Sequence, residues 1–339
     1  MNNPTTCDCP QPTIVVWEKQ EQAAHSMAQD VLDGLTRHPQ KQLQPMYFYD
    51  EVGSLLYELI TELPEYYPTR TEAALLKQVA PEILKLANPV EMVELGSGSS
   101  TKTRILLDAF RGVLKTYIPT DISQTMLTAT ENILQHDYPT LEISGLYGTF
   151  ETALASLLDV ENRMFVFLGS TIGNFPPAYQ TLLMQNIFHT MSPGHFFLLG
   201  YDMQPNVQKP QAVIEAAYND ADGITAQFNL NMLCHINKVL GADFNLKDWK
   251  HRAIYNTDAH QIEMHLESLR DQKVFVQALQ RTFTFEKGET ILTEISRKYD
   301  PTQLSQEMKK IGFDVTKSWV SENQYFGLML LTHRNVAYI

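Results

Sequence analysis

The feature that most constrains the fold is a regular alternation of strand-like and helix-like segments between residues 90 and 200. Five short apolar runs have the character of buried strands, at Glu91–Leu95, Thr116–Thr120, Glu142–Leu146, Met164–Leu168 and Phe196–Leu199. Helical patterns separate them, at Thr101–Phe110, Gln124–Gln135, Phe150–Leu158 and Ala178–Met191. Strands joined by helices of this length are typical of βαβ units. The sequence therefore predicts an α/β fold with a parallel sheet and helices on both faces.

The segment before this region is expected to be helical with one ordered turn. Helical patterns cover Glu18–Arg37 and Gly53–Thr61. Between Leu63 and Arg70, two prolines flank two tyrosines, which predicts a turn. Thr71 follows as the expected N-cap of a helix that reaches about Ala87.

The alternation breaks after residue 200. A long helical pattern over Gln211–Asn237 is interrupted at Asp222-Gly223, and strand-like runs follow at Gln261–Leu266 and Val274–Leu279, which together indicate an inserted α+β lobe. The end of the chain returns to the sheet pattern with a helix over Thr302–Gly312 and strands over Asp314–Val320 and Gly327–His333. A short polar turn joins the last two strands, so we expect an antiparallel hairpin at the sheet edge.

Charge and composition exclude several classes of function. The chain has 26 Lys+Arg against 39 Asp+Glu, a net charge of −13, and no basic cluster, so we expect no nucleic-acid partner. Its longest apolar runs are shorter than the roughly 20 residues of a membrane span, and its first residues lack a signal-peptide pattern. The three cysteines, of which Cys7 and Cys9 are expected on a loose polar tail, suit a reducing compartment and provide no metal site. These features predict a cytoplasmic protein without a membrane partner.

A glycine loop follows the first predicted strand. Gly96 and Gly98 allow a sharp turn and a close backbone approach to a ligand, but Thr101 replaces the third glycine of the dinucleotide fingerprint. Asp121 ends the next strand, where an acid suits the hydroxyls of a ribose. Together these features favour S-adenosylmethionine, which has no pyrophosphate, over a nicotinamide cofactor. The alternative is structural, with the glycines tightening a turn and Asp121 capping a helix.

Six separated blocks, in the same order, strongly resemble one enzyme family. They are residues 48–54 (FYDEVGS), 63–70 (LPEYYPTR), 94–99 (ELGSGS), 167–174 (FLGSTIGN), 225–229 (TAQFN) and 292–296 (LTEIS). The resemblance is to the S-adenosylmethionine-dependent histidine Nα-methyltransferases of ergothioneine biosynthesis, which make hercynine (Nα-trimethylhistidine). It extends from about Tyr47 to the C-terminus.

The resemblance implies a Rossmann-like class I methyltransferase sheet and a second, α+β lobe. The expected domains are residues 1–69 as the N-terminal part of the substrate lobe, 70–200 as the methyltransferase core, 201–296 as the inserted substrate lobe and 297–339 as the C-terminal completion of the sheet. The substrate is then expected between the two lobes, facing the methyl group.

The resemblance also implies a cofactor site. Its positions in this sequence are Tyr66, Gly96, Lys102, Asp121, Thr149 and Phe150. Thr149 stands where the family has an aspartate that contacts the adenine amine. A hydroxyl accepts the same hydrogen bond without the strength that a charge adds, so we expect the cofactor to bind, but more weakly.

The implied substrate site has two ends. The head-group contacts fall on Tyr49, Asn174 and Tyr218, and the imidazole contacts fall on Met264, Glu294 and Ser296. The residue types suit the ligand, because Glu294 accepts an imidazole N–H, Ser296 serves the other ring nitrogen and the Met264 thioether packs on the ring. On pattern alone, Met264 is core filler, and Glu294 and Ser296 are a polar strand face.

The reaction implied by the resemblance is methyl transfer to the α-amine of L-histidine, with Tyr49 and Asn174 orienting the amine as the catalytic pair. No metal is expected, and we expect a monomer. Three alternatives remain open at this point: a related N-methyltransferase for another amino acid or aromatic amine, a non-catalytic protein that kept the fold, and a nicotinamide dehydrogenase. The Glu294/Ser296 pair argues against another substrate, because it suits a ring with two nitrogens. The intact head-group residues argue against a non-catalytic protein, and the missing third glycine argues against a dehydrogenase.

Overall fold

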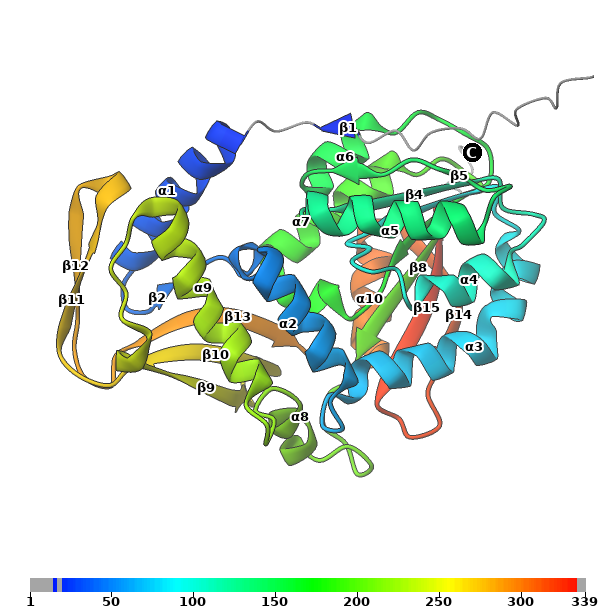
Figure 1. The fold of residues 1–339 in the computed structure, drawn as a ribbon. Helices are drawn as coiled ribbons and strands as arrows, with labels where there is room; N and C mark the ends of the chain where they lie inside the picture. The colour runs from blue at the N-terminus through cyan, green and yellow to red at the C-terminus, as the bar shows by residue number, and fades with distance from the viewer. Residues whose placement is uncertain (1–14, 17–19, 334–339) are drawn as a thin grey trace, which may run out of the picture.

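The computed structural model describes residues 15–16 and 20–333, and its main body is one large sheet (Figure 1). Its strands are β1 (Val15–Val16), β3 (Glu91–Leu95), β4 (Thr116–Asp121), β5 (Glu142–Ile143), β6 (Leu146–Tyr147), β7 (Arg163–Phe167), β8 (Phe196–Asp202), β14 (Phe313–Val320) and β15 (Phe326–His333). The order is β1-β6-β4-β3-β7-β8-β15-β14, with β5 also paired to β4. Pairing is parallel from β1 to β8, whereas β15 runs antiparallel to both β8 and β14. The predicted parallel sheet and edge hairpin are confirmed.

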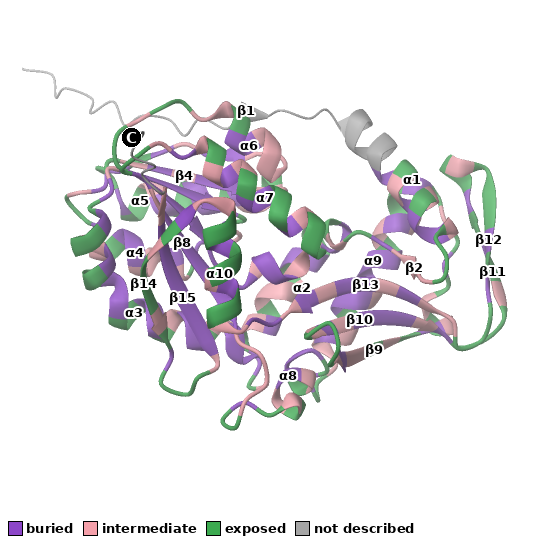
Figure 2. Ribbon diagram, turned by 180° about the vertical axis from the view of Figure 1, so that it is seen from behind, coloured by how far each residue is buried: buried purple, intermediate pink, exposed green. Residues whose placement is uncertain are grey.

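Helices cover both faces of this sheet. They are α3 (Tyr67–Ala87), α4 (Thr103–Ala109), α5 (Gln124–Asp137), α6 (Phe150–Ser156), α7 (Pro177–Thr190) and α10 (Pro301–Ile311). One hydrophobic cluster joins α3, α4 and α5 to the sheet, and another joins α6, α7 and α10 to its opposite face. Successive residues of β7 alternate between the clusters, with Met164 and Val166 in the first and Phe165 and Phe167 in the second, because side chains of a strand alternate between faces. Figure 2 shows the central strands buried between these layers.

A second lobe lies beside the large sheet, with its own four-stranded sheet and its own core. Its strands are β2 (Lys41–Gln42), β9 (Trp249–Asn256), β10 (Gln261–Ser268) and β13 (Thr290–Arg297), in the order β2-β13-β10-β9, and a separate ribbon pairs β11 (Gln272–Val276) with β12 (Arg281–Phe285). Its helices are α1 (Gln20–Thr36), α2 (Glu51–Glu62), α8 (Gln211–Ala217) and α9 (Ile224–Leu240). One hydrophobic cluster unites residues 27–67 with residues 214–291, so segments far apart in the sequence share this core. In both ribbon views α2 lies between the two sheets.

Two local predictions are wrong. The helix expected to begin at Thr71 begins at Tyr67, so part of the expected turn is helical. Pro68 is the second residue of α3, where its missing N–H and fixed φ suit a first turn, and proline near a helix start was therefore the signal that we misread. The strand expected over 142–146 is divided into β5 and β6, because the Gly145 N–H donates to the Glu131 carboxylate and not to β4.

Cys7 and Cys9 lie outside the described residues. Among the residues that the structure describes, no helix is both long and apolar enough to cross a membrane, and no group of three or more potential metal ligands occurs.

Candidate active site

A pocket between the two lobes collects most of the residues expected to bind substrate. All six of them line it: Tyr49, Asn174, Tyr218, Met264, Glu294 and Ser296. Tyr66, expected on the cofactor side, lines it too. The sequence analysis gave no role to the other lining residues, although four of them lie in the blocks that carry the resemblance; they are Tyr57, Ile60, Gly169, Thr171, Ala217, Thr225 and Phe228. The roles of the expected residues remain predictions, but the fold brings these side chains to one place.

The start of α2 holds Tyr49 at the pocket. Asp50, the N-cap of α2, accepts a hydrogen bond from the Gly53 N–H at 2.8 Å. The same carboxylate oxygen accepts a hydrogen bond from Asn231 on α9 at 2.7 Å, which ties the two helices together. Burial raises the pKa of the Tyr49 phenol well above its ordinary value, with Tyr57 and Glu294 adding to the effect. The Tyr49 phenol is therefore expected to keep its proton near neutral pH, where it can donate a hydrogen bond to a ligand.

Tyr66 is positioned by the turn before α3. The Arg70 guanidinium donates hydrogen bonds to the backbone carbonyls of Leu63 at 2.9 Å and Tyr66 at 3.1 Å, and also to that of Pro64. This arginine explains why the turn is ordered. Tyr66 is 7% exposed, and its ring contacts both Tyr57 and Tyr218 edge to face.

Asn174 reaches the pocket because a glycine precedes it. The short 3-10 helix Thr171–Asn174 lies against β13, and a Cβ on Gly173 would come within 2.6 Å of the backbone oxygen of Arg297. Only glycine allows this approach. The close contact brings the end of this helix, which follows a strand of the large sheet, to the sheet of the second lobe.

Strands β10 and β13 supply the ring end of the pocket. Met264 pairs with Glu294 across the two strands, and the next pair is His265 with Leu292, so Thr293 is left over as a bulge. The single hydrogen of the Thr293 hydroxyl has two acceptors within reach, the Asn229 side-chain oxygen at 2.7 Å and the Met264 carbonyl at 3.0 Å. Bulges of this kind re-aim side chains. Here the bulge shifts the buried face of β13, from Ile291 before it to Glu294 and Ser296 after it.

Glu294 is a buried carboxylate that faces the pocket without a hydrogen-bond donor from the described residues. It is 8% exposed, and none of the described residues donates a hydrogen bond to it. Burial raises its pKa to about 7, while the Lys298 ammonium opposes that rise. Because Glu294 lines the pocket, a ligand that supplies an N–H or O–H there gains a charge-assisted hydrogen bond. The pocket is therefore suited to a small molecule with a donor at this point.

Tyr218 and Ser296 form a hydroxyl pair beside Glu294. Tyr218 ends α8, and its hydroxyl donates to the Ser296 oxygen at 3.0 Å. Lys298, which the sequence analysis missed, donates to both of these oxygens. A signal for it was present, because Glu294, Ser296 and Lys298 continue one strand face with a period of two.

The cofactor side lies at the carboxyl ends of β3 and β4. Gly96 and Gly98 have φ angles of +71° and +52°, which other residues rarely adopt. A Cβ on Gly98 would meet nothing within 4 Å, so the loop borders open space, while one on Gly96 would face the Phe150 ring at 3.7 Å. The Asp121 carboxylate accepts hydrogen bonds from the N–H groups of Gly98 and Ser123, both at 2.8 Å. Each carboxylate oxygen thus accepts one of these bonds and can accept another, which fits two ribose hydroxyls.

Thr149 and Phe150 begin α6. The Thr149 hydroxyl caps this helix by accepting a hydrogen bond from the Thr152 N–H at 3.4 Å. Phe150 packs edge to face against Phe167 and Phe175. The hydroxyl that replaces the family's carboxylate is thus partly engaged with its own helix.

Lys102 forms an ion pair with Glu72, a residue of α3 to which the sequence analysis gave no role at the site. Both carboxylate oxygens of Glu72 accept a hydrogen bond from the Gly169 N–H at 2.9 Å. Glu72 is fully buried on α3 and therefore holds Lys102 beside the loop after β7. No local pattern pointed to this pairing, because the two residues are 30 positions apart.

The strand order reverses between β3 and β7, and ligands of open α/β sheets bind at the carboxyl ends of strands at such a point. The glycine loop, the open space that it borders and the half-buried Asp121 fit a nucleoside cofactor without a pyrophosphate there. Together with the strand order, they define a class I methyltransferase that uses S-adenosylmethionine.

Comparisons with known proteins identify the family. The sequence model of one family, the histidine-specific, S-adenosylmethionine-dependent methyltransferases, matches residues 27–333. The chain belongs to this family. Among curated relatives, the histidine N-alpha-methyltransferase of Mycolicibacterium smegmatis is 42% identical, over 91% of this chain and 96% of that protein. That of Mycobacterium tuberculosis is also 42% identical, with the same coverage. Ergothioneine biosynthesis protein 1 of Schizosaccharomyces pombe is 27% identical over 86% of this chain, which spans 39% of that longer protein.

Proposed function

We propose that this enzyme transfers methyl groups from S-adenosylmethionine to the α-amine of L-histidine and makes Nα-trimethylhistidine (hercynine) for ergothioneine biosynthesis. The observation that carries the proposal is the ring end of the pocket. The buried Glu294 carboxylate has no donor among the described residues, and the Ser296 hydroxyl lies on the same strand face. An imidazole satisfies both, because it has one N–H donor and one bare nitrogen.

The cofactor supplies an electrophilic methyl group on a sulfonium. Asp121 binds the ribose hydroxyls, the loop from Gly96 to Gly98 lets the backbone approach the ligand, and Phe150 provides an apolar wall. Lys102 lies beside the loop after β7, where its charge suits the carboxylate of the amino-acid portion. These assignments follow the family positions, and the geometry above supports them.

The enzyme's contribution to the chemistry is mainly positioning. An α-amino group has a pKa of roughly 7.7–8.0 in peptides and a higher value in a free amino acid. A fraction of the dissolved substrate is therefore already the neutral amine, and the enzyme can bind this form without a strong base. Tyr49, whose phenol keeps its proton, and Asn174 hold the amine so that its lone pair faces the methyl group. Good alignment of two reactants contributes up to about 7–11 kcal/mol.

Aromatic rings surround the place where the amine becomes a cation. Tyr49, Tyr57, Tyr66 and Tyr218 all line the pocket, and neighbouring rings meet edge to face with centroids 5.8, 6.4 and 6.0 Å apart. The electron-rich faces of such rings attract substituted ammonium groups. They provide an apolar lining that accepts each added methyl group, which is consistent with repeated methylation.

We also propose that the protein works as a cytoplasmic monomer whose two lobes follow the domain boundaries expected from the sequence. The odd number of cysteines and the small-molecule substrate support this setting.

Product masses test the function directly. The wild-type enzyme is incubated with S-adenosylmethionine and each amino acid in turn, and the products are followed by mass spectrometry. We expect mono-, di- and trimethylated histidine, with no methylation of phenylalanine or tryptophan at comparable rates. Preferred methylation of another amino acid would contradict the proposal and establish the related N-methyltransferase instead.

A further inference from the structure

Lys298 lies behind the pocket wall and does not line the pocket. Its side chain is fully buried, with no exposed surface. Its ammonium donates hydrogen bonds to the Tyr218 hydroxyl at 3.1 Å and to the Ser296 hydroxyl at 3.0 Å, and both of these residues do line the pocket. Lys298 is therefore one contact away from a bound substrate.

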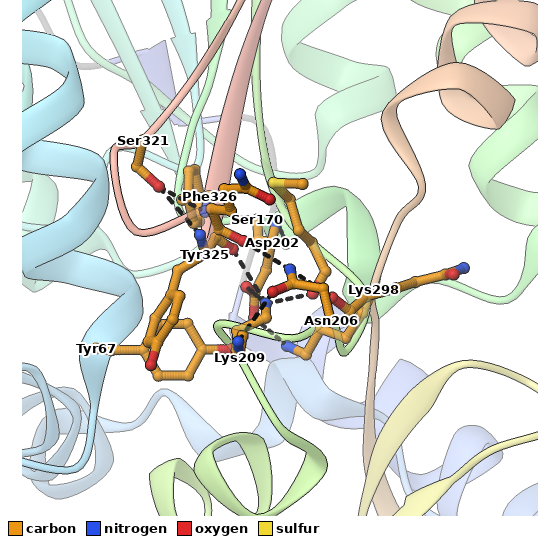
Figure 3. Close-up of polar contacts among 12 residues, drawn as sticks. Tyr67, Ser170, Asp202, Asn206, Lys209, Lys298, Ser321, Tyr325 and Phe326 are labelled. Atoms are coloured by element: carbon orange, nitrogen blue, oxygen red, sulfur yellow. Dashed lines mark hydrogen bonds and ion pairs between the residues drawn. The ribbon is translucent and has the colours of Figure 1, made fainter.

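The ammonium of Lys298 is held by a buried carboxylate from the large sheet. Asp202, at the end of β8, binds Lys298 through Oδ2 at 2.8 Å and binds a second buried lysine, Lys209, through Oδ1 at 2.6 Å. The Tyr67 hydroxyl donates to Oδ2 at 2.6 Å. Figure 3 shows this group of side chains and the dashed contacts among them. Asp202 raises the pKa of Lys298 above its ordinary value, so the lysine is charged.

The contacts of Lys298 decide which way the hydroxyl hydrogens point. An ammonium has three hydrogens and no lone pair, and here it has three acceptors, on Asp202, Tyr218 and Ser296. The Ser296 oxygen also accepts a hydrogen bond from Tyr218 at 3.0 Å. Both lone pairs of Ser296 are then occupied, and its single hydrogen is left for the pocket.

We propose that Lys298 is a positioning residue that makes Ser296 an obligatory hydrogen-bond donor and thereby selects one tautomer of the substrate's imidazole. Glu294 accepts from the ring N–H, and Ser296 donates to the bare ring nitrogen. A ring with a C–H in place of that nitrogen leaves the Ser296 hydrogen unpaired and is rejected. The inference rests on the proposed function, since it presumes that an imidazole occupies this end of the pocket.

Lys209 provides a matched control. It is also fully buried and binds the same carboxylate, but its other acceptors are the backbone oxygens of Met203 and Tyr325 and the Tyr67 hydroxyl. Within the described part of the chain, the Lys209 ammonium donates to neither Tyr218 nor Ser296. If Lys298 only stabilises the fold through Asp202, then Lys298→Met and Lys209→Met affect substrate choice alike.

The experiment measures substrate preference within each variant. Wild type, Lys298→Met and Lys209→Met are assayed with histidine and with the two pyrrolylalanine isomers, each of which keeps one ring N–H and replaces the other nitrogen with C–H. We expect the ratio of kcat/KM for histidine to that for the better isomer to fall about tenfold in Lys298→Met and to stay unchanged in Lys209→Met. An equal change in both variants, or no change in Lys298→Met, overturns the inference.

A second measurement needs no variant and covers the case in which Lys298→Met does not fold. Ring-labelled histidine is bound to the wild-type enzyme with S-adenosylhomocysteine at about pH 8, where the free imidazole is neutral. Nitrogen NMR is expected to show a single tautomer, with one protonated and one bare nitrogen. A mixture of tautomers, or an imidazolium, overturns the inference. If the wild-type enzyme does not methylate histidine at all, the proposed function fails first.

Discussion

The two ends of the active site each contain a carboxylate, the half-buried Asp121 and the buried Glu294, and the two carboxylates are prepared in opposite ways. Asp121, on the cofactor side, accepts two backbone hydrogen bonds at 2.8 Å from its own βα loop and the turn after β4. Glu294, on the substrate side, accepts none from the described residues, and burial raises its pKa to about 7. Burial also raises the pKa of Asp121, but the N–H groups of Ser123 and Gly98 oppose that rise.

This difference has a physical reason. A group that binds a part common to all substrates of a fold, such as a ribose, is held by the backbone of the fold itself. A group that recognises one particular ring is kept without a protein partner, so that the correct ligand completes it and an incorrect ligand leaves it unpaired. Selectivity is therefore expected to depend on Glu294 far more than on Asp121.

The largest effect that breaks this comparison is expected from Glu294→Ala. Removing the acceptor of the ring N–H should lower kcat/KM for histidine about a hundredfold, while the affinity for S-adenosylmethionine changes less than about twofold. The larger apolar space should make tryptophan methylation detectable, especially when combined with Met264→Val. Competition assays with histidine, tryptophan and phenylalanine measure the outcome. Full histidine turnover in the variant would mean that Glu294 does not contact the substrate.

On the other side of the comparison, Asp121→Ala should weaken S-adenosylmethionine binding ten- to a hundredfold. A hydrogen bond from a ribose hydroxyl to a charged group contributes about 1.5–3 kcal/mol, so the loss of this contact corresponds to a factor of about ten to a hundred. Calorimetry on the variant measures the affinity, with thermal unfolding as the control for folding. Unchanged affinity in a folded variant would sink the assignment of Asp121 to the ribose.

The pH dependence of kcat/KM for histidine tests the state of Glu294, with an expected effect of about tenfold. A carboxyl with a pKa of about 7 takes up a proton as the pH falls through 7, and the ionised acceptor of an N–H is then lost. We expect kcat/KM for histidine to rise about tenfold between pH 6 and pH 8 through ionisation of Glu294. Glu294→Gln, measured over the same range, corrects for the titration of the substrate itself. Identical profiles for the two proteins would show that Glu294 does not titrate there.

The smallest effect is expected from Thr149→Asp. A charged acceptor bonds the adenine amine more strongly than a hydroxyl, so S-adenosylmethionine should bind a few-fold more tightly. Aspartate is also a good N-cap, and α6 should therefore keep its stability. Calorimetry of cofactor binding decides, and weaker binding would indicate that the adenine is held by other groups, such as Glu151 or the backbone.

The sequence predicted the cofactor side more completely than the substrate side. Gly96, Gly98 and Asp121 follow directly from strands with clear patterns, so their place at the sheet edge could be inferred locally. Glu72 could not be paired with Lys102 in this way, because α3 lies outside the alternating segments and only packing brings the two together. The substrate residues were identified through the family resemblance, since each of them also suits an ordinary core or surface position.

The sequence by itself determined the alternation of strands and helices, the glycine loop and the residue types that an imidazole requires, because these depend on local periodicity and side-chain chemistry. Only the tertiary structure decided which way those side chains face. The bulge at Thr293 depends on the partner strand and on Asn229, and without it Glu294 would share a face with Leu292. Likewise, Lys298 reaches Asp202 only because the second lobe returns to the end of β8, and a buried charge requires that partner.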